Sequence, residues 1–267
     1  MQLFDTHTHS CFSADSRMEL QAAINQAKAR SLAGIVFTEH FDFDVPEGIT
    51  AFEFDPEQQQ QAIRSLCQHE DPQLTVLAGI EVGLQPGSVQ KIKNLLEGHH
   101  FDQIIASVHF VDGKDPYHGE YYVGLSPKEA YGRYLEVIYE CITLMPDFDI
   151  LGHYDYIARY SPYPDSICYK DYADVLDSIL RLLVERGQTL ELNTKTYRIK
   201  PDGNPLPDPV IYRRFKELGG EALSFGSDAH KIGHIGFHFE EYHQWVKDLG
   251  FRYSIHYRDR KPVLLPL

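Results

Sequence analysis

The sequence predicts an α/β protein whose strands form a barrel with helices outside it. Short apolar runs recur along the chain, and a stretch with helical periodicity follows each of them. Successive runs are separated by roughly 30–45 residues, the size of one strand-helix unit. Strands that alternate with helices pair in parallel and are covered by those helices. Seven such units in one chain favour a (β/α) barrel over an open doubly wound sheet.

The predicted strands are runs of aliphatic or aromatic residues at 2–4, 34–37, 74–80, 103–106, 148–151, 189–192 and 222–225. Helical periodicity is clearest in residues 18–33, 55–70, 127–145, 169–187 and 208–220. The last of these has Asp208 as N-cap, Pro209 in its first turn and two glycines at its end. Residues 251–267 predict two short strands around a turn. No Gly-x-Gly-x-x-Gly follows the first run, so a dinucleotide-binding fold lacks its usual support.

The composition excludes several classes of partner. The 267 residues are 43% hydrophobic and 24% charged, with a formal net charge of -14. Binding to nucleic acid or to an anionic membrane needs an excess of Lys and Arg, so the sequence disfavours both. No apolar run approaches the ~20 residues of a transmembrane helix, and no secretory signal pattern is found. We therefore expect one domain over residues 1–267, located in the cytoplasm; the sequence does not indicate an oligomeric state.

Cysteine usage agrees with a cytoplasmic location. Cys11, Cys67, Cys141 and Cys168 lie far apart and form no Cys-x-x-Cys pair. With a chain of this length available for a core, they need no disulfide.

Ionisable side chains gather at the predicted strand ends, which in a barrel converge on one face. Six of the 14 histidines fall there, beside acidic residues. The candidate ligands are His7, His9, Asp15, His40, Glu81, His109, His153, Asp228 and His230. Because side chains alternate along a strand, each His-x-His or Asp-x-His pair presents two ligands to one cavity. The alternative for the first pair is a polar surface loop.

This mixture of imidazole and carboxylate suits Zn, Mn or Fe, because Mg and Ca prefer oxygen ligands. The candidates outnumber what one tetrahedral ion uses, which implies two or three ions bridged by a carboxylate. Asp5, at the start of Asp-x-His-x-His, is expected to orient a ligand imidazole without binding metal. The eight other histidines are expected to be structural, with His118 and His238 nearest to the site.

Taken in order, the segments DTHTHSCFSAD, TEH, GIEVG, ASVHF, LGHYDYIARY, ELNTK and GSDAH resemble the motifs of PHP (polymerase and histidinol phosphatase) domain proteins. The resemblance spans essentially the whole chain and implies a distorted (β/α)7 barrel with three divalent ions. Carried over by motif, the ligands of the first ion are His7, His9, Glu81 and Asp228. Glu81 bridges to a second ion, which His109 and His153 complete. Asp15, His40 and His230 hold the third.

The size of the chain and the segments GHYDYIARY, ELNTKTYR and RKPVLLP resemble the stand-alone histidinol-phosphatase branch. This implies hydrolysis of a small phosphorylated substrate, L-histidinol phosphate, by metal-activated water. Arg159 and Arg198 are predicted to bind the phosphate, since a guanidinium donates two parallel hydrogen bonds. The alternative for either is a solvated surface charge.

Asn193 and Lys195 are secondary candidates for binding the phosphate. Asp228, His230 and Asp15 all remain candidates for the general acid, and Arg159 is counted with these catalytic residues.

Residues 41–55 form a long acidic and aromatic segment that is predicted to cover the site. Its carboxylates, Asp42, Asp44 and Glu47, would meet an amine or imidazolium on the substrate; the alternative is a solvated acidic loop.

Three other functions stay open. A PHP enzyme could act on another phosphomonoester or on a nucleotide phosphodiester, and a PHP-like module could bind metal without catalysis. The amidohydrolase superfamily also begins with a His-x-His strand, but its members commonly need a bridging lysine at the end of a strand in the middle of the barrel. In this chain the third predicted strand ends in Glu81, and the fourth and fifth end in histidines.

Overall fold

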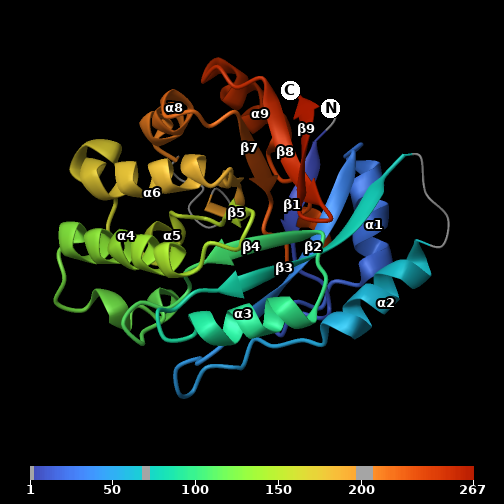
Figure 1. Ribbon diagram of the computed structural model, residues 1–267, viewed down its shortest axis with the longest axis horizontal. Coiled ribbons are helices and arrows are strands. Elements are labelled where there is room, and N and C mark those ends of the chain that lie inside the picture. Colours follow the sequence, from blue (N-terminus) through green and yellow to red (C-terminus); the bar gives the residue numbers. More distant parts are fainter. Residues whose placement is uncertain (1–2, 68–72, 197–206) are drawn as a thin grey trace.

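The described strands form one sheet in which they follow their order in the sequence. The computed structural model describes residues 3–67, 73–196 and 207–267 (Figure 1). Its strands are β1 (Phe4–Thr8), β2 (Gly34–Asp42), β3 (Thr75–Gly83), β4 (Gln103–Ser107), β5 (Ile150–Leu151), β6 (Thr189–Asn193), β7 (Ala222–Gly226), β8 (Tyr253–Arg258) and β9 (Lys261–Pro266). Pairing is parallel from β1 through β8 and antiparallel between β8 and β9. The predicted α/β class is confirmed.

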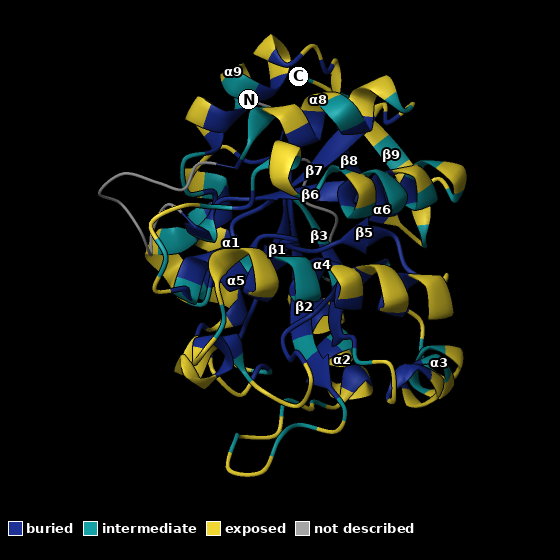
Figure 2. Cartoon of the chain, turned by 90° about the vertical axis from the view of Figure 1, so that its left-hand side faces the viewer, coloured by how far each residue is buried: buried dark blue, intermediate teal, exposed yellow. Residues whose placement is uncertain are grey.

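Helices lie around the outside of these strands (Figure 1). They are α1 (Leu20–Ala29), α2 (Pro56–Leu66), α3 (Val89–Gly98), α4 (Pro127–Leu144), α5 (Tyr156–Tyr160), α6 (Ala173–Glu185), α8 (Pro209–Glu217) and α9 (Phe239–Asp248). Their outer faces are exposed and the strands between them are buried (Figure 2). In the described part of the chain, no helix is both long and apolar enough to cross a membrane.

The predicted helix start at Asp208 is confirmed, and a second helix start is capped by side chains that the sequence analysis did not name. The side chain of Asp208 accepts a hydrogen bond from the Val210 N–H at the start of α8, and Pro209 follows it. Ser126 and Glu129 form a capping box at the start of α4. Both arrangements satisfy backbone N–H groups that have no partner inside the helix.

The first three strands extend further than the apolar runs predict. β1 ends at Thr8, β2 at Asp42 and β3 at Gly83, so their polar residues lie inside the strands and not after them. The cause is an unbroken parallel register between β2 and β3, from Gly34 opposite Thr75 to Asp42 opposite Gly83. Backbone pairing carries these strands past the apolar residues and so holds the polar side chains on rigid backbone.

The chain returns to β1 after β7. The Asp228 N–H donates to the His7 carbonyl at 2.8 Å, and the His9 N–H donates to the Ala229 carbonyl at 2.9 Å. Thr8 and Ala229 form a parallel bridge. The first and last polar motifs of the sequence therefore lie side by side.

The predicted terminal hairpin is confirmed as β8 and β9. Asp259 and Arg260 connect the two strands with φ angles of 52° and 61°. Two consecutive residues with positive φ match the twist of antiparallel strands in a tight turn. On the buried side of this hairpin, the ring of His256 stacks on that of Phe4 in β1.

Candidate metal centre

The nine predicted ligand residues lie together at one end of the strands. They are His7 on β1, His9 and Asp15 after it, His40 on β2, Glu81 on β3, His109 after β4, His153 after β5, and Asp228 and His230 after β7. The side chains of His7, His9 and Glu81 are fully buried, whereas that of Asp15 is 40% exposed. So many buried ionisable groups are costly unless they pair or bind ions.

Glu81 lies at the centre and separates the imidazoles into two groups. Its Oε2 atom is near His7 Nε2 at 3.0 Å, His40 Nδ1 at 2.9 Å and His9 Nε2 at 3.4 Å. Its Oε1 atom is near His153 Nε2 at 2.8 Å and His109 Nε2 at 3.4 Å. A carboxylate with nitrogen ligands on each oxygen is placed to bridge two cations.

Three central atoms support the presence of a cation. His7 Nε2, His9 Nε2 and Glu81 Oε2 are buried and form no hydrogen bond. These three residues present ligand atoms that all lie within 4.8 Å of one another. Buried polar atoms without partners cost free energy, and a divalent ion among their lone pairs removes that cost. The donor set of the described residues therefore fits divalent metal.

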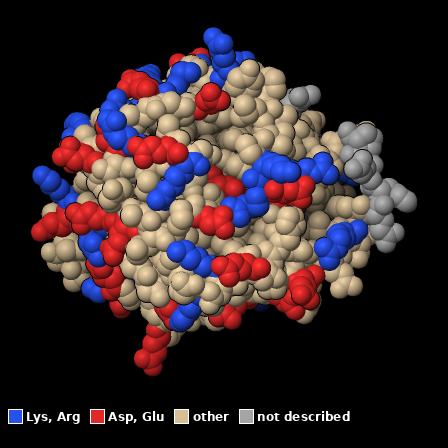
Figure 3. Space-filling model, viewed as in Figure 1, with Lys and Arg blue, Asp and Glu red and all other residues tan. Residues whose placement is uncertain are grey.

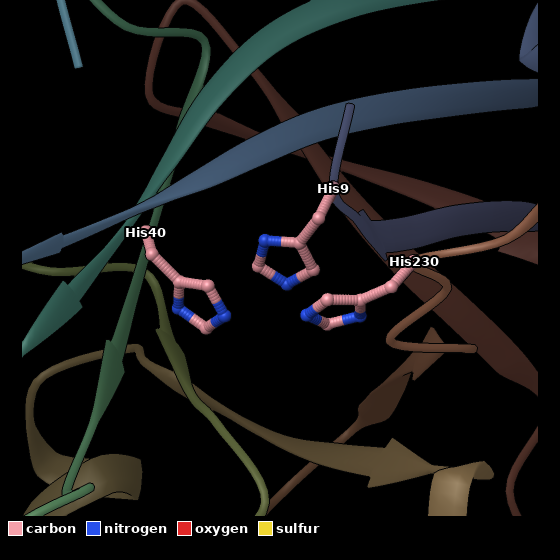
Figure 4. A group of neighbouring side chains, drawn as sticks. All are labelled: His9, His40 and His230. Atoms are coloured by element: carbon pink, nitrogen blue, oxygen red, sulfur yellow. The ribbon is translucent and has the colours of Figure 1, made fainter. Parts of the chain in front are cut away.

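A third group of imidazoles lies at the exposed side of the centre. The rings of His9, His40 and His230 point toward one another (Figure 4). Ring centroids are 4.0 Å apart for His9 and His40 and 4.2 Å apart for His9 and His230. Asp15 Oδ2 lies 2.9 Å from His230 Nε2 and 3.7 Å from His40 Nε2. The resemblance groups Asp15, His40 and His230; the structure brings these together and places His9 beside them.

The charges of the centre keep its carboxylates ionised. Burial alone would raise the pKa of Glu81, but the imidazoles of His7, His40 and His109 hold it well below its usual range. Burial opposes ionisation of Asp228 in the same way, and Lys195, His7 and His230 lower its pKa. Ionised carboxylates are the form that binds a cation.

Two carboxylates that the sequence analysis did not assign to the metal centre contact candidate ligand imidazoles. Glu191 Oε1 lies 2.7 Å from His7 Nδ1, and its Oε2 accepts from the His153 N–H. Asp42 Oδ1 lies 2.9 Å from His109 Nδ1. A carboxylate on the far nitrogen fixes the ring and its tautomer. The signal for Glu191 is its place two residues before Asn193 on one strand, where both side chains share a face.

The expected role of Asp5 is wrong. Its carboxylate accepts from the backbone N–H groups of Ser227 and Gly236 at 2.9 Å and 2.8 Å. Burial raises the pKa of Asp5 to about 6, against these hydrogen bonds. Asp5 thus fixes the segment after β7 against β1, and Glu191 contacts the His7 imidazole in its place.

The predicted phosphate-binding residues occupy different positions. Lys195 lines the cavity, and its Nζ lies 2.8 Å from Asp228 Oδ1. Arg159 is buried behind Asp228, with Nη1 2.9 Å from Asp228 Oδ2, and is not among the residues that line the cavity. Asn193 is also buried, and its amide donates to Glu191. Arg198 lies outside the described residues.

A cavity of about 670 Å³ opens beside the centre. The segment 41–55 lines part of it with Gly48, Ile49, Thr50 and Phe52. Of the three carboxylates that were predicted to face the substrate, Asp42 lines the cavity and the other two do not: Asp44 pairs with Lys91 at the surface, and Glu47 is exposed. Asp42 belongs to β2 and meets His109. The segment thus contributes one carboxylate, which is engaged by His109, and the surface of Gly48, Ile49, Thr50 and Phe52.

Two histidines expected to be structural border the cavity. His118 and His234 line it, whereas His238 lies beside Glu241 in a separate pocket. The short helical turns Pro116–His118 and Ile232–His234 carry the first two.

Comparisons with known proteins agree with this geometry. The family model described as "PHP domain" matches residues 5–195. A probable histidinol-phosphatase of Clostridium acetobutylicum is 34% identical over 241 residues, which cover 89% of this chain and 90% of that protein. The histidinol-phosphatase of Lactococcus lactis is 32% identical, covering 94% and 93%.

A solved structure is also similar. The crystal structure of histidinol phosphate phosphatase from Lactococcus lactis, complexed with zinc, L-histidinol and phosphate, superimposes with a TM-score of 0.88 at 29% identity. The alignment covers 98% of this chain and 99% of that one.

Proposed function

Because the chain belongs to the PHP domain family, we propose that it is a metal-dependent phosphatase that hydrolyses L-histidinol phosphate to L-histidinol and phosphate, in histidine biosynthesis. The observation that carries this proposal is the likeness, along nearly the whole chain, to a phosphatase with zinc, histidinol and phosphate bound. The buried cluster around Glu81 supports it, since hydrolysis of a phosphate ester needs cations at this type of site.

Residues 1–267 are proposed to form one domain, a distorted (β/α)7 barrel. The parallel bridge between Thr8 and Ala229, which joins β1 to the segment after β7, supports closure of the sheet. β8 and β9 then add to the barrel as a hairpin.

Three ions, of Zn, Mn or Fe, are proposed for the centre. The first would be held by His7, His9, Glu81 and Asp228, the second by Glu81, His109 and His153, and the third by Asp15, His40 and His230. When bound, such ions lower the pKa of water toward ~7 and neutralise charge on a phosphoryl group. The two-sided contacts of Glu81 support the bridging role.

The residues around Asp228 position the reacting groups. Lys195 extends to the cavity and is free to donate to a phosphate oxygen while it stays near Asp228. Arg159 is proposed to hold the Asp228 carboxylate from behind, because its own guanidinium is buried. The proton for the leaving alkoxide comes from Asp228, His230 or Asp15.

Part of the cavity lining is suited to a cationic organic group. Asp115 lies there, and Tyr117, Tyr156 and Tyr160 supply aromatic surface. Histidinol carries an amine and an imidazole, which a carboxylate and aromatic rings bind favourably. On the face shown in Figure 3, basic side chains lie among acidic ones, and the net charge of -14 adds no attraction for nucleic acid.

A substrate panel tests the proposed reaction. The kcat/KM for histidinol phosphate should exceed that for 4-nitrophenyl phosphate and for a nucleotide phosphodiester by at least about a hundredfold, or about 3 kcal/mol. Equal kcat/KM values for these compounds would refute histidinol phosphate as the substrate.

Elemental analysis of gently purified protein should find at least two equivalents of transition metal. Bound metal without any esterase activity would favour the non-catalytic module. The cytoplasmic location stays a prediction.

A further inference from the structure

The ring of His9 has no carboxylate partner at Nδ1, the ring nitrogen that faces away from Glu81. Its Nδ1 atom lies 3.1 Å from the hydroxyl oxygen of Ser13. His7 and His109, in contrast, each have a carboxylate oxygen at that position. A hydroxyl both donates and accepts, so it does not by itself decide which nitrogen of His9 carries the proton.

Glu39 removes this ambiguity. Its carboxylate is fully buried on β2 and accepts at Oε2 from the Ser10 N–H at 2.8 Å and from the Ser13 hydroxyl at 2.6 Å. Oxygen Oε1 accepts from the Ser10 hydroxyl at 2.6 Å. The Ser10 N–H has to donate to Oε2, and an ionised Glu39 can only accept, so with Glu39 ionised the proton on the short bond to Ser13 belongs to the serine.

The single proton of Ser13 is therefore committed to Glu39, and its oxygen is left to accept. The His40 N–H donates to that oxygen at 3.1 Å. The remaining neighbour is His9 Nδ1, which therefore donates. In a neutral imidazole a protonated Nδ1 leaves the lone pair on Nε2.

That lone pair faces two anionic oxygens. His9 Nε2 lies 3.4 Å from Glu81 Oε2 and 3.7 Å from Asp228 Oδ1, and it forms no hydrogen bond. Three electron-rich atoms then converge, which is an arrangement that a bound cation stabilises.

From these contacts we infer that Ser13, with its hydroxyl oriented by Glu39, is a positioning residue that fixes His9 as the Nδ1–H tautomer and so presents Nε2 to metal. This inference rests on the proposed metal centre. Outer partners of this kind contribute about 10–100-fold in metal affinity.

The test compares three variants of the full chain with the wild type. Ser13→Ala removes the acceptor, and Ser13→Thr keeps a hydroxyl. Ser16→Ala is the matched control, because Ser16 is a buried serine of the same loop whose hydroxyl donates to the backbone carbonyls of His9 and His230 and not to a ring. NMR spectra of metal-free protein with ¹⁵N-labelled histidine report the tautomer of His9 through the chemical shifts of its two ring nitrogens. The His9 signals are assigned by their loss in His9→Gln. Calorimetric titration with Zn²⁺ reports affinity.

We expect Nδ1–H in the wild type and in Ser16→Ala. Ser13→Ala should admit the Nε2–H tautomer and weaken zinc binding about 10–100-fold, and Ser13→Thr should recover most of that loss. Nε2–H in the wild type, an unchanged tautomer and affinity in Ser13→Ala, or an equal loss in Ser16→Ala would overturn the inference. A wild type that binds no Zn²⁺ refutes the metal centre instead, because the tautomer is measured without metal.

Discussion

His40 and Glu81 are direct partners across the β2–β3 ladder, and the nitrogen Nδ1 of His40 lies 2.9 Å from Oε2 of Glu81. Their side chains leave neighbouring backbone positions on one face of the sheet. The strands on either side, β1 and β4, bring further imidazoles to the same carboxylate. The geometry of the centre is thus fixed by strand register.

Glu81→Gln tests the central carboxylate. The amide loses the negative charge and gives one oxygen instead of two to the imidazoles on its two sides. Residues that only orient the ligands of a metal site already contribute about 10–100-fold to metal affinity or activity. Loss of a ligand shared by two ions should therefore lower kcat/KM by more than about 100-fold and remove at least one ion. Steady-state kinetics and elemental analysis measure the two effects. Glu129→Gln, in the exposed capping box of α4, should retain full metal content; equal loss there would contradict the role of Glu81.

Removal of metal should destabilise the protein. Bound ions offset repulsion among Asp15, Glu81 and Asp228 and satisfy nitrogens that otherwise lack partners. Saturation of one site at 100 times its Kd stabilises by about 2.7 kcal/mol, which raises Tm by roughly 5–10 °C in a chain of this size. Thermal unfolding with chelator, and again after Zn²⁺ is restored, measures this. A Tm that chelator does not lower would argue against a preformed centre.

The sequence predicts that the candidate ligands gather at one end of the strands, because their signal is local. Most of these residues follow an apolar run closely, and parallel strands place their carboxyl ends at one edge. Order along the chain is therefore enough to bring His7, Glu81 and Asp228 together. The hydrogen-bonding partners of the ligands are harder to predict. Glu191 and Glu39 meet their imidazole and serine only through tertiary packing.

The prediction for Asp5 failed for the same reason, and the surroundings of Arg159 differ from those that its local sequence suggests. Asp5 binds amides of a segment more than 220 residues away, which no local pattern reveals. Arg159 lies on α5 with Asp155 one turn before it, a pair typical of an exposed helix. Here the helix packs inward, so the guanidinium is buried against Asp228, and its Nη2 atom forms no hydrogen bond. Binding of phosphate by Arg159 stays a prediction.

Asp115→Asn tests recognition of the organic part of the substrate. The Asp115 side chain is 12% exposed at the cavity and accepts from the Tyr117 N–H at 2.8 Å. Loss of its charge should raise the KM for histidinol phosphate about tenfold, because a charge-assisted hydrogen bond contributes about 1.5–3 kcal/mol. The kcat/KM for 4-nitrophenyl phosphate, which has no cationic group, should stay the same. Asp112→Asn, which breaks an exposed pair with Arg133, is the control. Equal losses on both substrates would contradict a role in specificity.

His256 should make stability depend on pH. Its ring is buried in the hairpin, stacked on Phe4 with centroids 3.6 Å apart, and its Nδ1 has no hydrogen-bond partner. Burial, together with Arg258, lowers the pKa of His256 from 6.5 to about 4. The unfolded chain therefore binds a proton below pH 6.5 that the folded chain refuses until about pH 4. The stability that neutral His256 provides above pH 6.5 is lost as the pH falls through that window, by up to about 3 kcal/mol.

His256→Phe keeps the stacked ring and removes the titration, so it should lose less stability than the wild type between pH 6.5 and pH 4. Urea unfolding of both proteins, measured without metal at each pH, isolates this difference, since protonation of the metal-centre histidines is common to both. Their free energies of unfolding should diverge steadily as the pH falls below 6.5, because the unfolded wild type gains a proton at His256 that the variant has no group to bind. Parallel curves would mean that His256 is already protonated in the folded protein at pH 6, against the geometry of its stack on Phe4.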